Sequence, residues 1–120
     1  MKFIAFLISL VAAIDDRFHS IETIITENGF AFEQHSVTTL DGYILTLHRI
    51  PGSGSPILLQ HGIEDSTMEW IINSEDKALA FMLSRKGHDI WMGNNRGNTY
   101  SMGHVNLTSK QKEFWDFDQE

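Results

Sequence analysis

The stretch from residue 57 to residue 92 decides the fold of this 120-residue chain. It opens with ILLQHG (57–62), which begins with the apolar run 57–59. It closes with DIWM (89–92), which contains the apolar run 90–92. Such continuous runs predict strands that are covered on both faces. Between them lies SEDKALAFMLSRKG (74–87), which carries the pattern of a helix. Strand, helix and strand in one sheet form a βαβ unit, in which the strands are parallel and the crossover is right-handed.

The predicted helix has a start signal and a stop signal. Ser74 is a suitable N-cap, and the acidic residues that follow it favour the positive end of the helix dipole. An apolar stripe and two basic residues come next, and Gly87 is a natural C-terminal stop. We therefore expect the helix to begin directly after Ser74.

A hairpin precedes this unit. The segments 34–40 and 43–49 alternate apolar and polar positions, as antiparallel strands with one wet face do. They flank Asp41-Gly42, which predicts a type I′ turn with positive φ at both residues. The fold class is therefore α/β, with an antiparallel hairpin leading into a parallel βαβ unit.

Composition excludes several classes of protein. The chain is 42% hydrophobic and 21% charged, as in an ordinary globular domain, and its length allows one domain at most. It has no cysteine, so disulfides, cysteine ligands and a cysteine nucleophile are excluded. A net charge of −7 argues against nucleic acid as a partner, because that binding needs cationic side chains. We expect no cofactor and no metal site.

The first thirteen residues carry the pattern of a secretory signal peptide. Lys2 supplies the positive start, an apolar run follows, and Val11 and Ala13 are small residues suited to a cleavage site. The run is too short to span a membrane, which takes about 20 apolar residues. We therefore expect residues 1–13 to be removed, residues 14–120 to fold, and the protein to be secreted or lysosomal. The alternative is a buried N-terminal helix.

Loops at the carboxyl ends of parallel strands are where such sheets place their chemistry. QHGI (60–63) occupies that place after the first predicted strand. In α/β hydrolases a His-Gly pair at this point lets the next backbone N–H point at the developing oxyanion of an acyl-transfer intermediate. His61 and Gly62 therefore predict an oxyanion loop, although the dipeptide alone is a weak signal.

Four stretches together resemble the acid lipase family, the lysosomal acid lipase and gastric lipase type of α/β hydrolase. They are HSVTTLDGYIL (35–45), LLQHGI (58–63), GHDIWMGNNRGNTYS (87–101) and FWDF (114–117). The resemblance implies hydrolysis of neutral lipid esters, triacylglycerols or sterol esters, by a Ser, Asp and His triad. It also implies that the backbone N–H of Ile63 forms one half of the oxyanion hole. Glu64 departs from the apolar residue common at the next position, and we expect it to face solvent.

The nucleophile of that triad is absent from the sequence. Its motif is G-x-S-x-G, and no serine here has glycine at both minus two and plus two. In α/β hydrolases the acid and the histidine follow the nucleophile, so none of the six histidines is predicted to be catalytic. We expect the N-terminal portion of a larger, here incomplete α/β-hydrolase fold, poorly soluble and without esterase activity by itself. The alternative is a noncatalytic remnant or a module that needs another chain.

Two further motifs lie after the second strand. NNRGNTYS (94–101) is either the wall of the active-site cleft or, the interpretation we favour, a structural turn with Arg96 donating to carbonyls. Asn106-Leu107-Thr108 is an acceptor sequence for N-glycosylation, which predicts a glycan on Asn106 if the chain enters the secretory pathway.

Overall fold

The structure is a computed structural model that describes residues 20–118, so the predicted signal peptide lies outside the described residues. Its elements are, in chain order, α2 (Ile21–Glu27), β1 (Glu33–Thr38), β2 (Tyr43–Ile50), β3 (Pro56–Gln60), the 3-10 helix η2 (Thr67–Trp70), α3 (Leu79–Arg85), β4 (Asp89–Gly93), β5 (Gly103–His104) and the 3-10 helix η3 (Lys112–Trp115).

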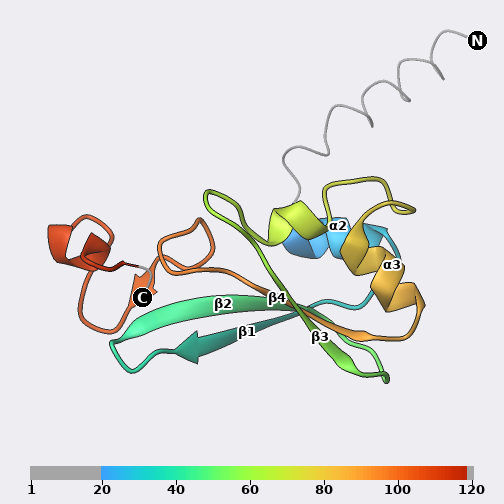
Figure 1. Ribbon diagram of the computed structural model, residues 1–120, viewed down its shortest axis with the longest axis horizontal. Coiled ribbons are helices and arrows are strands. Elements are labelled where there is room, and N and C mark those ends of the chain that lie inside the picture. The colour runs from blue at the N-terminus through green and yellow to red at the C-terminus, as the bar shows by residue number, and fades with distance from the viewer. Residues whose placement is uncertain (1–19, 119–120) are drawn as a thin grey trace, which may run out of the picture.

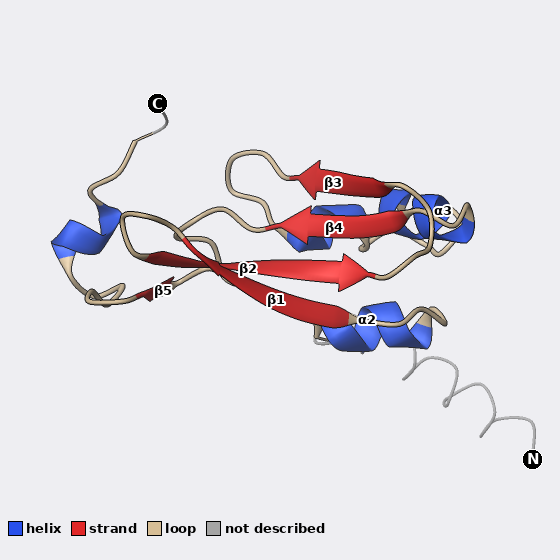
Figure 2. Ribbon diagram, turned by 90° about the horizontal axis from the view of Figure 1, so that it is seen from below, coloured by secondary structure: helices blue, strands red, loops and turns tan. Residues whose placement is uncertain are grey.

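The strands form one mixed sheet in the order β1-β2-β4-β3, and the short β5 pairs with β2 (Figures 1 and 2). β1, β2 and β4 are antiparallel neighbours, whereas β3 and β4 are parallel. This topology confirms the α/β class, the hairpin and the parallel βαβ unit. In the parallel pair Gln60 lies opposite Gly93. Both strands therefore end at the same edge, and the loops that follow them start side by side.

The turn of the hairpin differs from the prediction. Gly42 has a φ of 97°, but Asp41 does not share the positive φ that a type I′ turn needs. Instead the Gly42 N–H donates to the Thr39 carbonyl, and the Thr39 N–H donates to the Tyr43 carbonyl. The loop is thus longer by two residues. Within this loop Gly42 alone has a left-handed conformation, which glycine adopts without strain, so Asp41 keeps a negative φ.

Helix α3 begins four residues later than the sequence predicts. The Ser74 hydroxyl donates to the Asp76 carboxylate, and among the described residues no backbone N–H donates to it, so Ser74 does not act as a side-chain cap. Its carbonyl closes a separate turn with the N–H groups of Lys77 and Ala78, and the helix starts after Ala78 without a side-chain cap. The predicted stop is confirmed, since Gly87 has a φ of 88° and its N–H donates to the Ser84 carbonyl.

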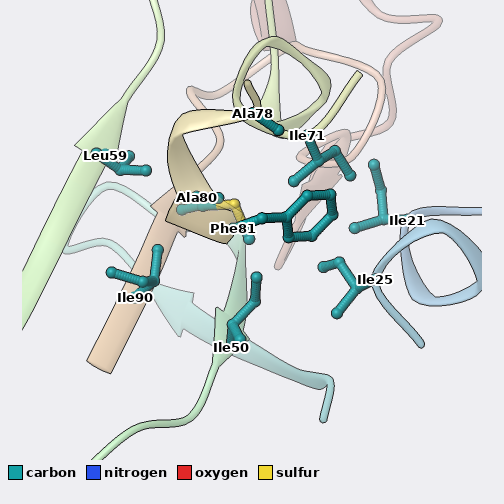
Figure 3. Close-up of a cluster of buried hydrophobic side chains, with 10 residues drawn as sticks. Ile21, Ile25, Ile50, Leu59, Ile71, Ala78, Ala80, Phe81 and Ile90 are labelled. Atoms are coloured by element: carbon teal, nitrogen blue, oxygen red, sulfur yellow. The ribbon is translucent and has the colours of Figure 1, made fainter. Parts of the chain in front are cut away.

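The hydrophobic core lies between the sheet and both helices, which cover the same face of the sheet (Figures 1 and 3). Helix α2 has Ser20 as its N-cap, and Ile21 and Ile25 point into the core. Phe81 of α3 is fully buried among them. The whole cluster comprises Ile21, Ile25, Ile50, Leu59, Ile71, Ala78, Ala80, Phe81, Ile90 and Met92. Burial of apolar area in this one layer is the main force that holds the described residues together.

The opposite face of the sheet carries a row of side chains from four strands. Register places Leu58 beside Trp91, Trp91 beside Arg49, and Arg49 beside Glu33. Leu58 is 62% exposed. The expectation that the first parallel strand is covered on both faces is therefore wrong for the described residues, since both helices lie on the core side. Strand β4 is buried at four of its five positions, as predicted.

Candidate functional site

The loops that follow β3 and β4 line one open pocket of about 420 Å³. Residues 61–65 form one wall and residues 95–99 form the other. The sequence predicts chemistry at this edge of the sheet, and the structure brings His61, Gly62 and Ile63 to it together. It also shows that the segment 94–101 is both a wall of the pocket and a hydrogen-bonded turn, so the two interpretations of that segment do not exclude each other.

His61 is buried and both of its ring nitrogens are used. Nδ1 lies 2.7 Å from the carbonyl oxygen of Gly62. Nε2 lies 3.0 Å from the Asn95 backbone nitrogen and 3.1 Å from Nδ2 of Asn98. A carbonyl can only accept and an N–H can only donate. The ring is therefore neutral, with its proton on Nδ1 and its lone pair on Nε2.

Ile63 lies at the mouth of the pocket. Its side chain is 82% exposed, and among the described residues its backbone N–H has no hydrogen-bond partner. Gly62, just before it, has an ordinary negative φ, and a Cβ built there would meet nothing within 4 Å. The left-handed residue of the loop is Glu64, with a φ of 60°. Glu64 is exposed, as expected, and belongs to the same wall of the pocket.

Asn98 organises the opposite wall, a role that sequence reasoning missed. Its Oδ1 accepts from the backbone N–H groups of Tyr100 and Ser101, which is the pattern of an Asx turn. Its Nδ2 donates to His61 and to Oδ1 of Asn94. The sequence carried a signal for this role, because an asparagine side chain in a turn commonly accepts a hydrogen bond from the backbone N–H two residues further along the chain.

A buried polar cluster lies behind this wall. Asn94 is 3% exposed, and its amide donates to the Thr46 carbonyl and to the Thr67 hydroxyl. The Thr67 hydroxyl lies 2.9 Å from Nδ1 of His48. Burial lowers the pKa of His48 from 6.5 to about 4, so this imidazole is neutral at physiological pH. The strand alternation places His48 on the same face as Ile50, and that alternation was the signal for its burial.

Arg96 ties the pocket loop to the hairpin. Its guanidinium donates to the Asp41 carboxylate and stacks 4.4 Å from the centre of the Tyr43 ring. The prediction that Arg96 donates to backbone carbonyls is therefore wrong, because the acceptor is the carboxylate of Asp41. Its structural character is confirmed, because these contacts point away from the pocket toward the hairpin turn.

Asn106, the predicted glycosylation site, lies in an exposed bend after β5. Its backbone N–H donates to Nδ1 of His104 at 3.0 Å, and no hydrogen bond of its side-chain amide is present among the described residues. Thr108 of the acceptor sequence is exposed as well. The acceptor sequence is thus accessible in this fold.

Residues 20–118 contain neither a cluster of metal ligands nor a helix that could span a membrane. No group of three or more His, Asp or Glu side chains in that range lies together as metal ligands would. No helix in the same range is long and apolar enough to cross a membrane.

Known proteins are similar in sequence to this chain. Residues 21–74 match the family described as a partial alpha/beta-hydrolase lipase region. The chain is 44% identical to Lipase 1 of Drosophila melanogaster over 82% of its own length and 23% of that protein. It is also 44% identical to human Lipase member K over 82% of its own length and 27% of the relative.

A further relative is a Crotalus adamanteus protein provisionally named lysosomal acid lipase/cholesteryl ester hydrolase, 44% identical over 82% of this chain. The chain spans about a quarter of the length of each of these relatives. Sequence matches and sheet topology agree. The chain is thus similar in sequence to acid lipases and carries a partial α/β-hydrolase lipase region at residues 21–74.

Proposed function

We propose that this chain supplies one half of the oxyanion hole of a lipase that hydrolyses carboxylic esters of neutral lipids, triacylglycerols or sterol esters. The observation that carries the proposal is the backbone N–H of Ile63, which has no partner among the described residues and stands at the pocket after β3. A preorganised N–H of this kind stabilises the negative charge that develops on the ester oxygen during acyl transfer. Removing one such donor typically costs about 2.7–4 kcal/mol in the transition state.

The exposed side chain of Ile63 fits the same function. An apolar group beside the oxyanion donor offers a surface for the acyl chain of a lipid ester, and Ile63 is 82% exposed there. His61 and Gly62 would shape the loop. The nucleophile, the acid and the catalytic histidine would belong to the three quarters of the relatives that this chain does not match.

The proposal also covers the cellular location of the protein. A signal peptide at residues 1–13 would lead residues 14–120 into the secretory pathway, toward secretion or the lysosome, consistent with the name of the Crotalus relative. A noncatalytic module that pairs with another chain is the alternative. It shares the sheet and the pocket with the lipase but needs no free donor at Ile63.

A chimera tests the catalytic proposal. Residues 14–120 replace the matching segment of human Lipase member K, which is 44% identical. We expect the chimera to hydrolyse a long-chain triacylglycerol and the 120-residue chain alone to hydrolyse none. Ile63→Pro removes the N–H and should lower kcat of the chimera by about 100-fold to 1,000-fold. Ile63→Val keeps the N–H and should leave kcat within a few fold of the parent.

Thermal unfolding of each chimera reports whether it has folded. A folded Ile63→Pro chimera with the kcat of its parent would contradict the oxyanion role. Turnover by the isolated 120-residue chain would contradict the placement of the nucleophile elsewhere.

A further inference from the structure

We infer that His61 and Asn98 are positioning residues that aim the Ile63 N–H into the pocket, His61 by holding the preceding peptide and Asn98 by fixing the His61 ring. The inference rests on the proposed function, because it explains how a loop donor stays free and directed. Neither side chain is assigned a contact with the reacting atoms.

The first step is the geometry of the peptide between Gly62 and Ile63. A trans peptide is planar, so its C=O and its N–H point in opposite directions. The His61 ring holds the Gly62 oxygen at 2.7 Å through its Nδ1–H. The N–H of Ile63 must then point away from the His61 ring, and it is the donor that finds no partner among the described residues. A hydrogen bond on one side of the peptide thus orients the group on the other side.

The second step is the tautomer. His61 can donate from Nδ1 only if the neutral ring carries its proton there, and the environment of Nε2 selects that state. Two donors face Nε2, the Asn95 backbone N–H at 3.0 Å and the Asn98 amide at 3.1 Å. A proton on Nε2 would leave the Asn95 N–H and one N–H of the Asn98 amide without an acceptor, and an unsatisfied buried polar group costs free energy.

The third step is the anchor behind Asn98. Its amide also donates to Oδ1 of Asn94 at 3.0 Å, and the same Asn94 oxygen accepts the Thr67 N–H at 3.0 Å. The Asn94 amide in turn donates to the Thr46 carbonyl of β2. Hydrogen bonds therefore connect the oxyanion loop through the second loop to the sheet, so the donor at Ile63 is held from a rigid element.

The same contacts define what His61 does not do. A general base needs a free lone pair within reach of the proton it abstracts. The Nε2 lone pair of His61 is taken by two donors of the protein itself, and Nδ1 carries a proton that is already donated. His61 acts on the reaction through Ile63 and not as a base.

Nitrogen NMR of the full 120-residue chain tests the tautomer. We expect the ring nitrogens of His61 to show protonated Nδ1 and unprotonated Nε2 at neutral pH, in slow exchange with the other form. Protonated Nε2, or averaged shifts typical of a free imidazole, would overturn the inference. An unfolded chain would give the averaged shifts and so count against it.

Variants test the positioning role by hydrogen exchange at the Asn95 amide. His61→Phe removes the acceptor and should speed exchange of that amide by about tenfold, the loss expected for one hydrogen bond. His61→Gln can place an oxygen near the position of Nε2 and should restore most of the protection. Asn98→Ser keeps a side-chain oxygen for the turn but removes the amide donor, so the His61 tautomer should become mixed.

Asn73→Ser is the matched control, because Asn73 is exposed and lies outside this network. It should leave the tautomer and the Asn95 exchange rate unchanged. Equal exchange rates in wild type and His61→Phe, or a control that changes as much as Asn98→Ser, would overturn the inference. Because no readout needs catalysis, an inactive chimera with the expected tautomer counts against the proposed function alone. An active chimera with the other tautomer counts against the inference alone.

Discussion

Asp89 joins the sheet to the loop that precedes β3. Its carboxylate accepts from Nε of Arg49 at 2.9 Å and Nη2 of Arg49 at 3.1 Å. It also accepts from the Trp91 indole at 2.9 Å and from the Gly52 N–H at 3.2 Å. A carboxylate with four donors is strongly favoured in its charged form. The hydrogen bonds from Arg49 and then those from Trp91 and Gly52 lower the pKa of Asp89 from 3.8 to about 2.

This pKa predicts how stability depends on acid. A carboxyl group with a lowered folded-state pKa stabilises the fold above its unfolded value, and that contribution is lost as pH falls. We expect the contribution of Asp89 to be complete above about pH 4 and to disappear by about pH 2. Asp89→Asn should be less stable than wild type at pH 7, and the difference should shrink across this window.

Urea denaturation of the 120-residue chain between pH 7 and pH 2 measures the effect. Asp116→Asn is the control, since Asp116 is exposed and lies outside the cluster around Asp89. Its stability should follow that of wild type at each pH. A constant difference between Asp89→Asn and wild type at all pH values would refute the assignment to ionisation.

At the scale of elements, two left-handed glycines end or reverse the chain for different reasons. Gly87 terminates α3 with a φ of 88°, and a Cβ there would meet nothing within 4 Å. Gly42 closes the hairpin with a φ of 97°, and a Cβ there would lie 2.8 Å from side-chain atoms of His104 and Val105. The hairpin turn is therefore packed against the end of β5 and the residue that follows it, which the sequence did not indicate.

Alanine at the two positions separates backbone strain from packing. Gly87→Ala should destabilise by about 1–2 kcal/mol, the cost of a left-handed residue with a Cβ. Gly42→Ala carries the same backbone cost and must also displace residues 104–105, so it should destabilise by about 1 kcal/mol more, as typical overpacking does. Denaturant midpoints of the two variants give the comparison. Equal losses would show that residues 104–105 yield without cost.

At the scale of the whole molecule, the sheet is covered on one face. Helices α2 and α3 lie on the core side (Figure 1). Strand register places the row from Leu58 to Glu33 on the other side. That second face is half polar, because Arg49 is paired with Glu33 at 2.8 Å and with Asp89 at 2.9 Å. Leu58 and Trp91 are the apolar members of this row. The edge of β3 that faces away from β4 has no strand partner among the described residues.

Entry into the secretory pathway gives a whole-molecule prediction. Expressed in a eukaryotic secretory cell, the chain should carry a glycan on Asn106, because the acceptor sequence is exposed. Enzymatic deglycosylation should then increase the gel mobility of wild type and of Thr108→Ser, which keeps the acceptor pattern. Asn106→Gln and Thr108→Ala should not shift. An unshifted wild type would contradict either entry into the pathway or use of this acceptor.

Local patterns predicted the strands well and the helix boundary badly. Apolar runs placed β3 and β4 almost to the residue, although β3 lies at the edge of the sheet and Leu58 is exposed on its far face. The predicted start of α3 was wrong because the Ser74 carbonyl closes a separate turn with the N–H groups of Lys77 and Ala78, a local alternative that a capping rule does not weigh. The predicted type I′ turn was wrong because Gly42 marks one residue with a left-handed conformation but does not determine how many residues the loop contains.

The sequence by itself determined the class of the fold, the order of its strands in the βαβ unit and the position of the loop that carries His61 and Gly62, because periodicity and glycine placement act over a few residues. Only the tertiary structure decided which loop faces that site and how it is held. Asn95 and Asn98 reach His61 from more than thirty positions away, at 3.0 and 3.1 Å. Contacts of that kind depend on the parallel register of β3 and β4, which local sequence rules do not contain.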